Sequence, residues 1–240
     1  MNAFDLLRQG DSLSQGVALA LLAMSVGSWI VILWKAWMLL RAHRDVARST
    51  AAFWQAPTLS DGLRAVQLFD REVLVAPLVE ASQVQTSGTL AGAGDRSQQL
   101  TRLLRDALHA VLLKLQAGQV LLATVGSTAP FVGLLGTVWG IYHALMGISG
   151  AGQVSIDKIS GPVGEALIMT AAGLAVAIPA VLGYNILGRY IGRIEADLEG
   201  FARDLRELLI TQTITAGPSQ GERAPSGGSV VHAVTSVGAP

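Results

Sequence analysis

Three long apolar stretches alternate with polar segments along the chain. Residues 17–40, 119–148 and 161–187 are each long enough, at about 1.5 Å per helical residue, to cross a hydrocarbon layer roughly 30 Å thick. A polar insertion, residues 41–118, separates the first two, and its leucines recur at helical spacing toward its end. Residues 188–215 continue such a pattern after the third stretch. The pattern predicts an all-α polytopic membrane protein with three transmembrane helices, which are extended by further helices outside the membrane.

Lysine and arginine residues are distributed unequally between the two sides of these spans. Nine lie in the insertion and five follow residue 187, whereas two, Arg8 and Lys158, lie on the other side. Because cytoplasmic segments carry the excess of basic residues, we expect the amino terminus outside and the carboxyl terminus in the cytoplasm. The segments outside the membrane are then 1–16 and 149–160 on the outer side, and 41–118 and 188–215, both helical, in the cytoplasm.

The composition excludes several classes of protein. With 51% hydrophobic and 14% charged residues, the chain is too apolar for an ordinary soluble domain. Its formal net charge of zero gives no indication of a nucleic-acid partner, and the absence of cysteine removes disulfides and thiolate metal sites. We find no hydrolase triad, phosphate-binding loop or metal cluster, so we do not expect an enzyme. Residues 216–240, rich in Gly, Ser and Pro, predict a disordered tail.

One lysine lies within the first apolar stretch. Lys35 is surrounded by Trp29, Trp34 and Trp37, which suits an aromatic belt at a membrane interface. We interpret Lys35 as a snorkelling side chain whose ammonium reaches water, in preference to a buried functional amine.

Glu165 is the single acidic residue of the third stretch. An ionised carboxyl inside a membrane costs several kcal/mol unless it pairs, faces water or is protonated. We therefore interpret Glu165 as a site that takes up and releases a proton, with a protonated acid in a static bundle as the alternative. One carboxyl per chain cannot complete a relay, so further copies of the chain or a partner would have to supply other groups around a shared interior.

Small residues in the second and third stretches predict close helix packing. The second stretch has glycines seven residues apart, which nearly share one helical face: Gly126, Gly133, Gly140 and Gly147. The third has a small-residue seam about 100° away from the Glu165 seam: Ala166, Thr170, Gly173, Ala177 and Ala180. We expect the two small-residue faces to pack together, and Pro130 and Pro179 to bend their helices.

Two long segments carry a family resemblance. TAPFVGLLGTVWGI at residues 128–141 and GEALIMTAAGLAVAIPAVLGYN at residues 164–185 resemble the MotA/TolQ/ExbB proton-channel family, most closely its ExbB branch. The resemblance implies a bacterial inner-membrane subunit with a periplasmic amino terminus, forming a homopentamer around the single spans of an ExbD-like dimer. Such a complex would use proton-motive force to energise a TonB-like protein, with protons as the coupling ion and no other cofactor.

The resemblance also implies roles for three residues. Glu165 falls on the family's essential intramembrane glutamate, while Thr137 and Thr170 fall on polar pore positions, and the partner would supply an aspartate. Thr170 lies about 140° from Glu165 on an ideal helix, so the two cannot face one narrow pore squarely. Each threonine has an alternative role, a hydrogen bond to its own preceding turn.

Two further functions remain open at this point. A TolQ-like subunit would use a similar channel to energise a TolA-type protein for envelope maintenance. A passive membrane scaffold would need the small-residue faces alone, and Glu165 would then be structural.

Overall fold

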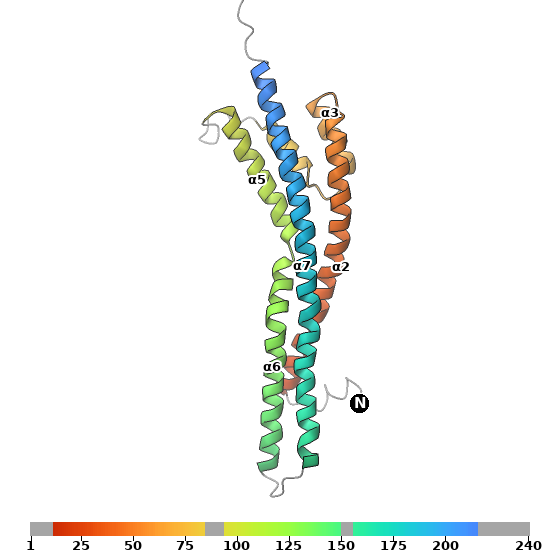
Figure 1. The fold of residues 1–240 in the computed structure, drawn as a ribbon, viewed down its shortest axis with the longest axis vertical. Coiled ribbons are helices and arrows are strands. Elements are labelled where there is room, and N and C mark those ends of the chain that lie inside the picture. Colours follow the sequence, from red (N-terminus) through yellow and green to blue (C-terminus); the bar gives the residue numbers. More distant parts are fainter. Residues whose placement is uncertain (1–11, 85–93, 150–155, 216–240) are drawn as a thin grey trace, which may run out of the picture.

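The described part of the protein is almost entirely helical, and its longest helices lie roughly along the long axis of the molecule (Figure 1). The computed structural model describes residues 12–84, 94–149 and 156–215, a part of the chain that contains no β-strand. The helices there are α2 (Ser12–Trp54), α3 (Leu59–Phe69), α4 (Ala76–Gln83), α5 (Arg96–Gln116), α6 (Gln119–Ser149) and α7 (Ile156–Thr215). Of the predicted outer segment 1–16, residues 1–11 fall outside the described residues, as does the tail, 216–240, whereas residues 12–16 already belong to α2.

Three helices, α2, α6 and α7, are long and apolar enough to cross a membrane. This confirms the predicted all-α class with three spans. The helices α2, with 43 residues, and α7, with 60, continue well beyond their apolar runs. The start of α7 at Ile156 lies within the stretch 149–160 that the sequence suggested as a loop. Pro130 lies inside α6 and Pro179 inside α7, and neither proline ends its helix.

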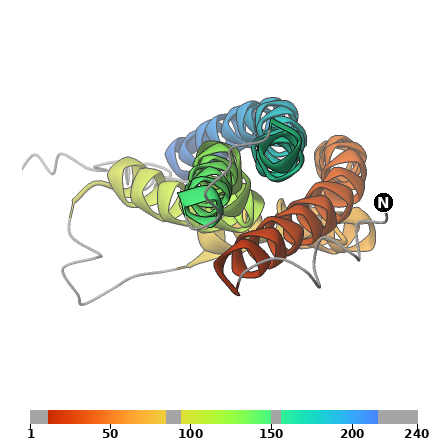
Figure 2. The same ribbon diagram turned by 90° about the horizontal axis from the view of Figure 1, so that it is seen from below.

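Two hydrophobic clusters hold the helices together. At the level of the apolar runs, α2 lies across one side of the α6–α7 pair (Figure 2), with Val17 and Leu21 packed against Val125, Ala129 and Ala177. A larger cluster joins the second half of α2 to α3, α4, α5 and the second half of α7. Its most deeply buried side chains include Leu39, Val46, Leu78, Leu115, Ile194 and Leu198. The insertion is therefore folded onto the extensions of α2 and α7.

Lys35 does not snorkel, so the interpretation from sequence is wrong. Its side chain is 1% exposed, and its Nζ donates a hydrogen bond of 3.2 Å to the carbonyl oxygen of Lys114, in the last turn of α5. This carbonyl is available because α5 ends at Gln116 and the chain turns at Gly118, which has a positive φ of 86°. Helix α5 thus does not run straight into α6, and Lys35 contacts the partly negative end of α5.

Asp70 organises the connection between α3 and α4. Its carboxylate accepts hydrogen bonds from the backbone N–H groups of Leu74, Val75 and Ala76, at 2.8, 2.8 and 2.7 Å. These include donors at the start of α4, where the residue preceding the helix, Val75, provides no side-chain cap. The buried carboxylate therefore replaces the missing cap and fixes the loop.

We predict that Asp70→Ala lowers the free energy of unfolding by about 2 kcal/mol, because three buried N–H donors lose a charged acceptor. Chemical denaturation of the detergent-solubilised chain measures this change. Asp204→Ala is the matched control, since Asp204 is exposed on α7, and its effect should stay within about 0.5 kcal/mol. Equal effects of the two substitutions would contradict the capping role.

Candidate functional site

Two threonines meet where α6 and α7 cross. Thr137 of α6 is 7% exposed, and its Oγ1 lies within hydrogen-bonding distance of the Thr170 Oγ1 on α7. The same Thr137 oxygen lies 3.0 Å from the carbonyl oxygen of Ala166 and 3.2 Å from that of Gly133. The structure thus brings together two of the three residues that the family resemblance marks.

The Thr137 hydroxyl has more acceptors than it has protons. It carries one O–H, yet two carbonyl oxygens and the Thr170 hydroxyl oxygen surround it. The bond to Gly133 is the turn-to-turn bond that the alternative reading of the sequence expected, and it coexists with contacts to α7. Rotation about one C–O bond is sufficient to redirect this proton between the two helices.

Glycines allow the close approach that this contact requires. A Cβ built on Gly133 would lie 2.6 Å from the carbonyl oxygen of Met169 and 3.1 Å from the Cα of Gly173. A Cβ on Gly173 would in turn lie 2.7 Å from the carbonyl oxygen of Ala129. Because these neighbours are backbone atoms, no rotamer change could relieve the overlap. The hydroxyl contact therefore depends on both glycines.

The other glycines of the seven-residue series differ in their surroundings. A Cβ on Gly140 would meet the Ala166 side chain at 2.8 Å, and one on Gly126 would meet the Val181 side chain at 2.6 Å. A Cβ on Gly147 would meet no described atom within 4 Å, so the described part of the chain gives no support for the packing role expected there.

Glu165 lies apart from the threonine pair. It is exposed on the surface of the single chain, although its neighbour Ala166 is buried against α6. Among the described residues it has no hydrogen bond or ion pair. The sequence predicted that Glu165 and Thr170 lie on different faces of the helix. In the structure Glu165 indeed faces outward, and Thr170 lies at the contact between α6 and α7.

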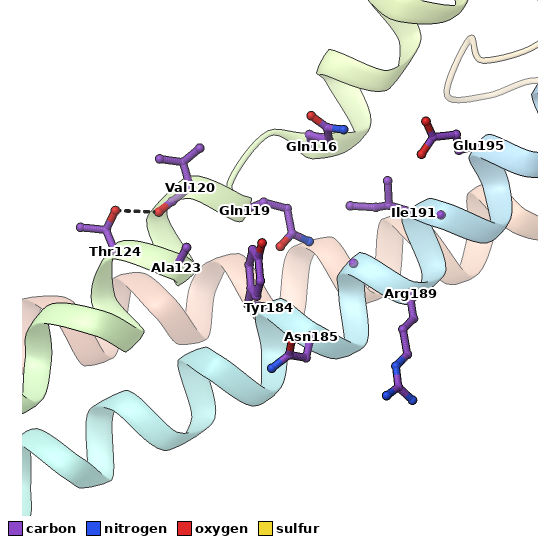
Figure 3. Close-up of a pocket in the computed structure, with 12 residues that line it drawn as sticks. Gln116, Gln119, Val120, Ala123, Thr124, Tyr184, Asn185, Arg189, Ile191 and Glu195 are labelled. Carbon is purple, nitrogen blue, oxygen red and sulfur yellow. Dashed lines mark hydrogen bonds between the residues drawn. The ribbon is translucent and has the colours of Figure 1, made fainter.

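A cavity of about 720 Å³ with both polar and apolar lining residues lies at the opposite end of the α6 span (Figure 3). Gln119 points toward Tyr184 of α7, and Gln116, Asn185 and Glu195 also line the cavity (Figure 3). The Gln119 side chain is 9% exposed, and neither of its amide atoms has a hydrogen-bond partner among the described residues. Buried amides without partners are rare, so water or another ligand is expected to satisfy them.

Sequence reasoning missed this cavity. Asn185, a polar residue near the end of an apolar stretch, was a usable signal, whereas Gln119 gave none because it begins a helix after a glycine. Within the described residues, no group of three or more His, Cys, Asp or Glu side chains could hold a metal ion.

The fold and site together define a multi-pass membrane protein with three spanning helices, hydroxyls between the second and third, and an unpaired carboxyl on the third. Residues 69–200 match the family model described as "MotA/TolQ/ExbB proton channel family". The chain is 43% identical over 212 residues to the biopolymer transport protein ExbB of Xanthomonas campestris pv. campestris (strain B100), an alignment that covers 84% of each chain.

The alignments with two other relatives cover nearly the whole length of those relatives. ExbB of Neisseria meningitidis serogroup B (strain MC58) is 36% identical over 222 residues, which cover 88% of this chain and 99% of the relative. The Tol-Pal system protein TolQ of Haemophilus influenzae is 30% identical over 236 residues, which cover 91% and 98%. The chain belongs to the MotA/TolQ/ExbB proton-channel family.

Proposed function

We propose that the chain is the proton-conducting subunit of an ExbB–ExbD-like complex of the bacterial inner membrane. This complex would use proton-motive force to energise a TonB-like protein for uptake across the outer membrane. The observation that carries the proposal is Glu165, a carboxyl on the exposed surface of a membrane-spanning helix that has no polar partner among the described residues. Such a group facing lipid costs several kcal/mol, so another chain or water must cover it.

An assembly meets this requirement. In a homopentamer around the spans of an ExbD-like dimer, each Glu165 faces a shared interior, where the partner's aspartate approaches it. The amino terminus is then periplasmic, and the insertion and carboxyl terminus are cytoplasmic. The chain acts as a channel and motor subunit without enzymatic activity, and it needs no cofactor, with protons as the coupling ion.

The proton path in this proposal has three parts. Glu165 receives a proton from the periplasmic side, Thr137 and Thr170 supply redirectable hydroxyls, and the cavity at Gln119 forms the cytoplasmic outlet. The family relationship supports the role of Glu165, and the contacts of Thr137 with Ala166 and Thr170 support the role of the two hydroxyls. Moving one charge through 100 mV releases about 2.3 kcal/mol, which drives motion because the protonated and ionised forms of Glu165 contact the partner differently.

Complementation tests the proposed function. The chain, expressed with its ExbD-like partner in a strain that lacks its own energising subunits, is expected to restore TonB-dependent uptake. The TolQ relative makes envelope maintenance the second candidate. Restored envelope integrity without uptake would favour that role, and restoration of neither, by a chain that assembles in the membrane, would support a passive scaffold.

We predict that Thr137→Val lowers proton flux about tenfold, the effect of losing one hydrogen bond worth roughly 1.4 kcal/mol in the path. Valine keeps the side-chain volume, so the helices should still pack. The measurement is dye-reported proton flux in vesicles that hold the chain with its partner. Thr137→Ser, which retains a hydroxyl, is the control and should conduct at a rate near that of the wild type. Unchanged flux in the valine variant would restrict Thr137 to a structural role.

A further inference from the structure

A second cavity, of about 420 Å³, gathers basic side chains at the end of the first apolar stretch. Arg41, Arg44 and Arg48 line it from α2, and Arg71 lines it from the α3–α4 connection. Its other lining residues are Trp37, Leu40 and Asp45. Four arginines thus line one cavity together with a single acidic residue.

These arginines lack acidic partners. None of the four forms an ion pair with a described residue, and Arg41 instead stacks over the Trp37 ring at 4.8 Å. Asp45 is buried, and its Oδ2 has no hydrogen-bond partner in the described part of the chain. Grouped positive charges repel one another unless an anion lies between them. The cavity therefore carries an excess of positive charge in the chain alone.

The fold holds Arg71 beside the arginines of α2. Its neighbour Asp70 fixes the connection through the three backbone hydrogen bonds to Leu74, Val75 and Ala76. Arg71 is thus presented by a firmly held loop, although 23 positions of sequence separate it from Arg48. Two separate elements, α2 and the loop, contribute to one basic cavity.

The apolar rim of the cavity indicates the type of anion. Trp37 is 61% exposed and Leu40 is also exposed, and both precede Arg41 at the boundary of the membrane-spanning run. Tryptophan at this level marks the headgroup region, where phosphates lie beside the ends of acyl chains. A soluble anion or an acidic protein would use the guanidinium groups without needing the apolar rim.

We propose that this cavity binds the headgroup of an anionic phospholipid from the leaflet next to the insertion. Guanidinium groups bind phosphate oxygens in bidentate geometry, and basic pockets beside spanning helices are suited to such headgroups. The bound lipid joins α2 to the α3–α4 connection, so it stabilises the insertion against the membrane.

Binding of phosphatidylglycerol to the full-length chain in detergent tests the proposal. In a native mass spectrometry titration, the wild type should bind phosphatidylglycerol more tightly than phosphatidylcholine. Replacing three arginines by glutamine, R44Q, R48Q and R71Q together, should weaken phosphatidylglycerol binding about 100-fold, since each arginine near an anionic surface contributes roughly a factor of five.

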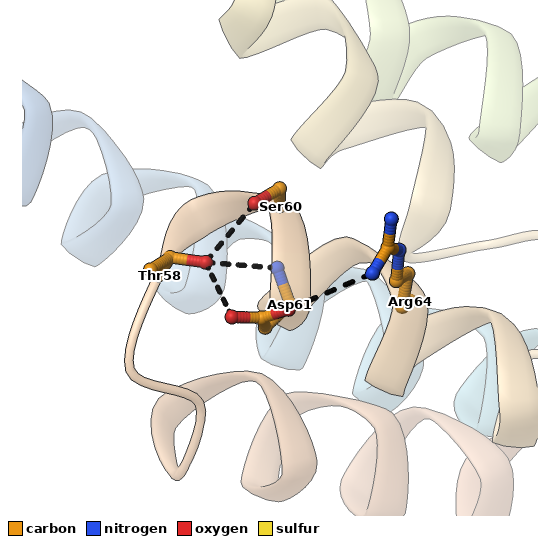
Figure 4. A network of polar contacts seen from close by, with 4 residues as sticks. All are labelled: Thr58, Ser60, Asp61 and Arg64. Atoms are coloured by element: carbon orange, nitrogen blue, oxygen red, sulfur yellow. Dashed lines mark hydrogen bonds and ion pairs between the residues drawn. The ribbon is translucent and has the colours of Figure 1, made fainter.

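A matched control removes the same charge elsewhere. Arg64 of α3 lies on the same insertion but pairs with Asp61 at 3.9 Å, next to the Thr58 cap (Figure 4). A variant that combines R64Q with R105Q and R203Q, all at exposed positions, should bind phosphatidylglycerol as the wild type does. An equal loss in both triple variants would overturn the proposal, because it would show diffuse attraction by net charge.

Two further results would also overturn it. Inorganic phosphate that displaces phosphatidylglycerol at equal concentration would identify a site for free phosphate. Lipid binding that persists in the glutamine triple while association between chains is lost would identify a protein interface. If the glutamine triple does not fold, the lysine triple R44K, R48K and R71K keeps the charge and should bind within about tenfold of the wild type. Equal binding of phosphatidylglycerol and phosphatidylcholine by the wild type would also contradict the proposal.

Discussion

Replacement of Glu165 by glutamine is expected to abolish TonB-dependent uptake while leaving the chain folded and assembled. Glutamine keeps the size and hydrogen-bonding capacity of a protonated glutamate but cannot release a proton. Because Glu165 is exposed on the single chain and has no hydrogen bond or ion pair with a described residue, the substitution removes no polar interaction that holds the helices together. The measurement is uptake in a strain that contains the partner proteins and no second copy of the system.

The control for this prediction lies on the same helix. Glu199, exposed on the α7 extension, can be changed to glutamine with the same loss of charge, and uptake should be unaffected. Assembly, read as the size of the detergent-solubilised complex, should be equal in both variants. Retained uptake in Glu165→Gln would sink the proton-site assignment and leave the static-bundle alternative.

The second large effect is expected from leucine at Gly133. A single added Cβ would lie 2.6 Å from the carbonyl oxygen of Met169, and a whole leucine side chain would force α6 and α7 apart. Overpacking of this kind costs about 3 kcal/mol, and separating the helices would also break the contact between Thr137 and Thr170. We therefore expect loss of both the folded chain and its activity, measured as detergent-stable yield and uptake.

Gly147→Leu tests whether the loss expected for Gly133→Leu depends on the position of the glycine or follows from placing leucine at any glycine of α6. Gly147 lies on the same helix, and a Cβ there would meet no described atom within 4 Å. Yield should therefore match that of the wild type. A similar loss at both positions would show that added bulk anywhere on α6 disrupts the fold, which would contradict the specific role of Gly133.

Much of the fold could be predicted from local pattern. The three spans follow from hydropathy and length, because the membrane requires about 20 apolar residues wherever a helix crosses it. Glu165 was recognisable for the same reason, since its transfer cost makes an acid in such a stretch unusual. The offset of Thr170 from Glu165 came from helical periodicity alone, and the structure indeed places only Thr170 beside Thr137.

Long-range contacts could not be predicted in this way. Lys35 looks like an interfacial cation because its tryptophan neighbours are close in sequence, whereas its hydrogen-bond acceptor, the Lys114 carbonyl, is 79 residues away. The bonds from Asp70 to three backbone donors depend on the path of a short loop. The cavity at Gln119 depends on the turn at Gly118, which periodicity does not reveal.

The length of α7 has a mechanical consequence. The helix continues without interruption from Glu165 to Thr215, a distance of about 75 Å at 1.5 Å per residue. A rod of that length, tilted by only about 2° near Glu165, carries its far end through roughly 3 Å. Helix α7 also packs against α2, α4, α5 and α6 along the way. If Glu165 acts as proposed, a change in its protonation can therefore be transmitted along α7 to α4 and α5 of the insertion, as a lever transmits a small displacement.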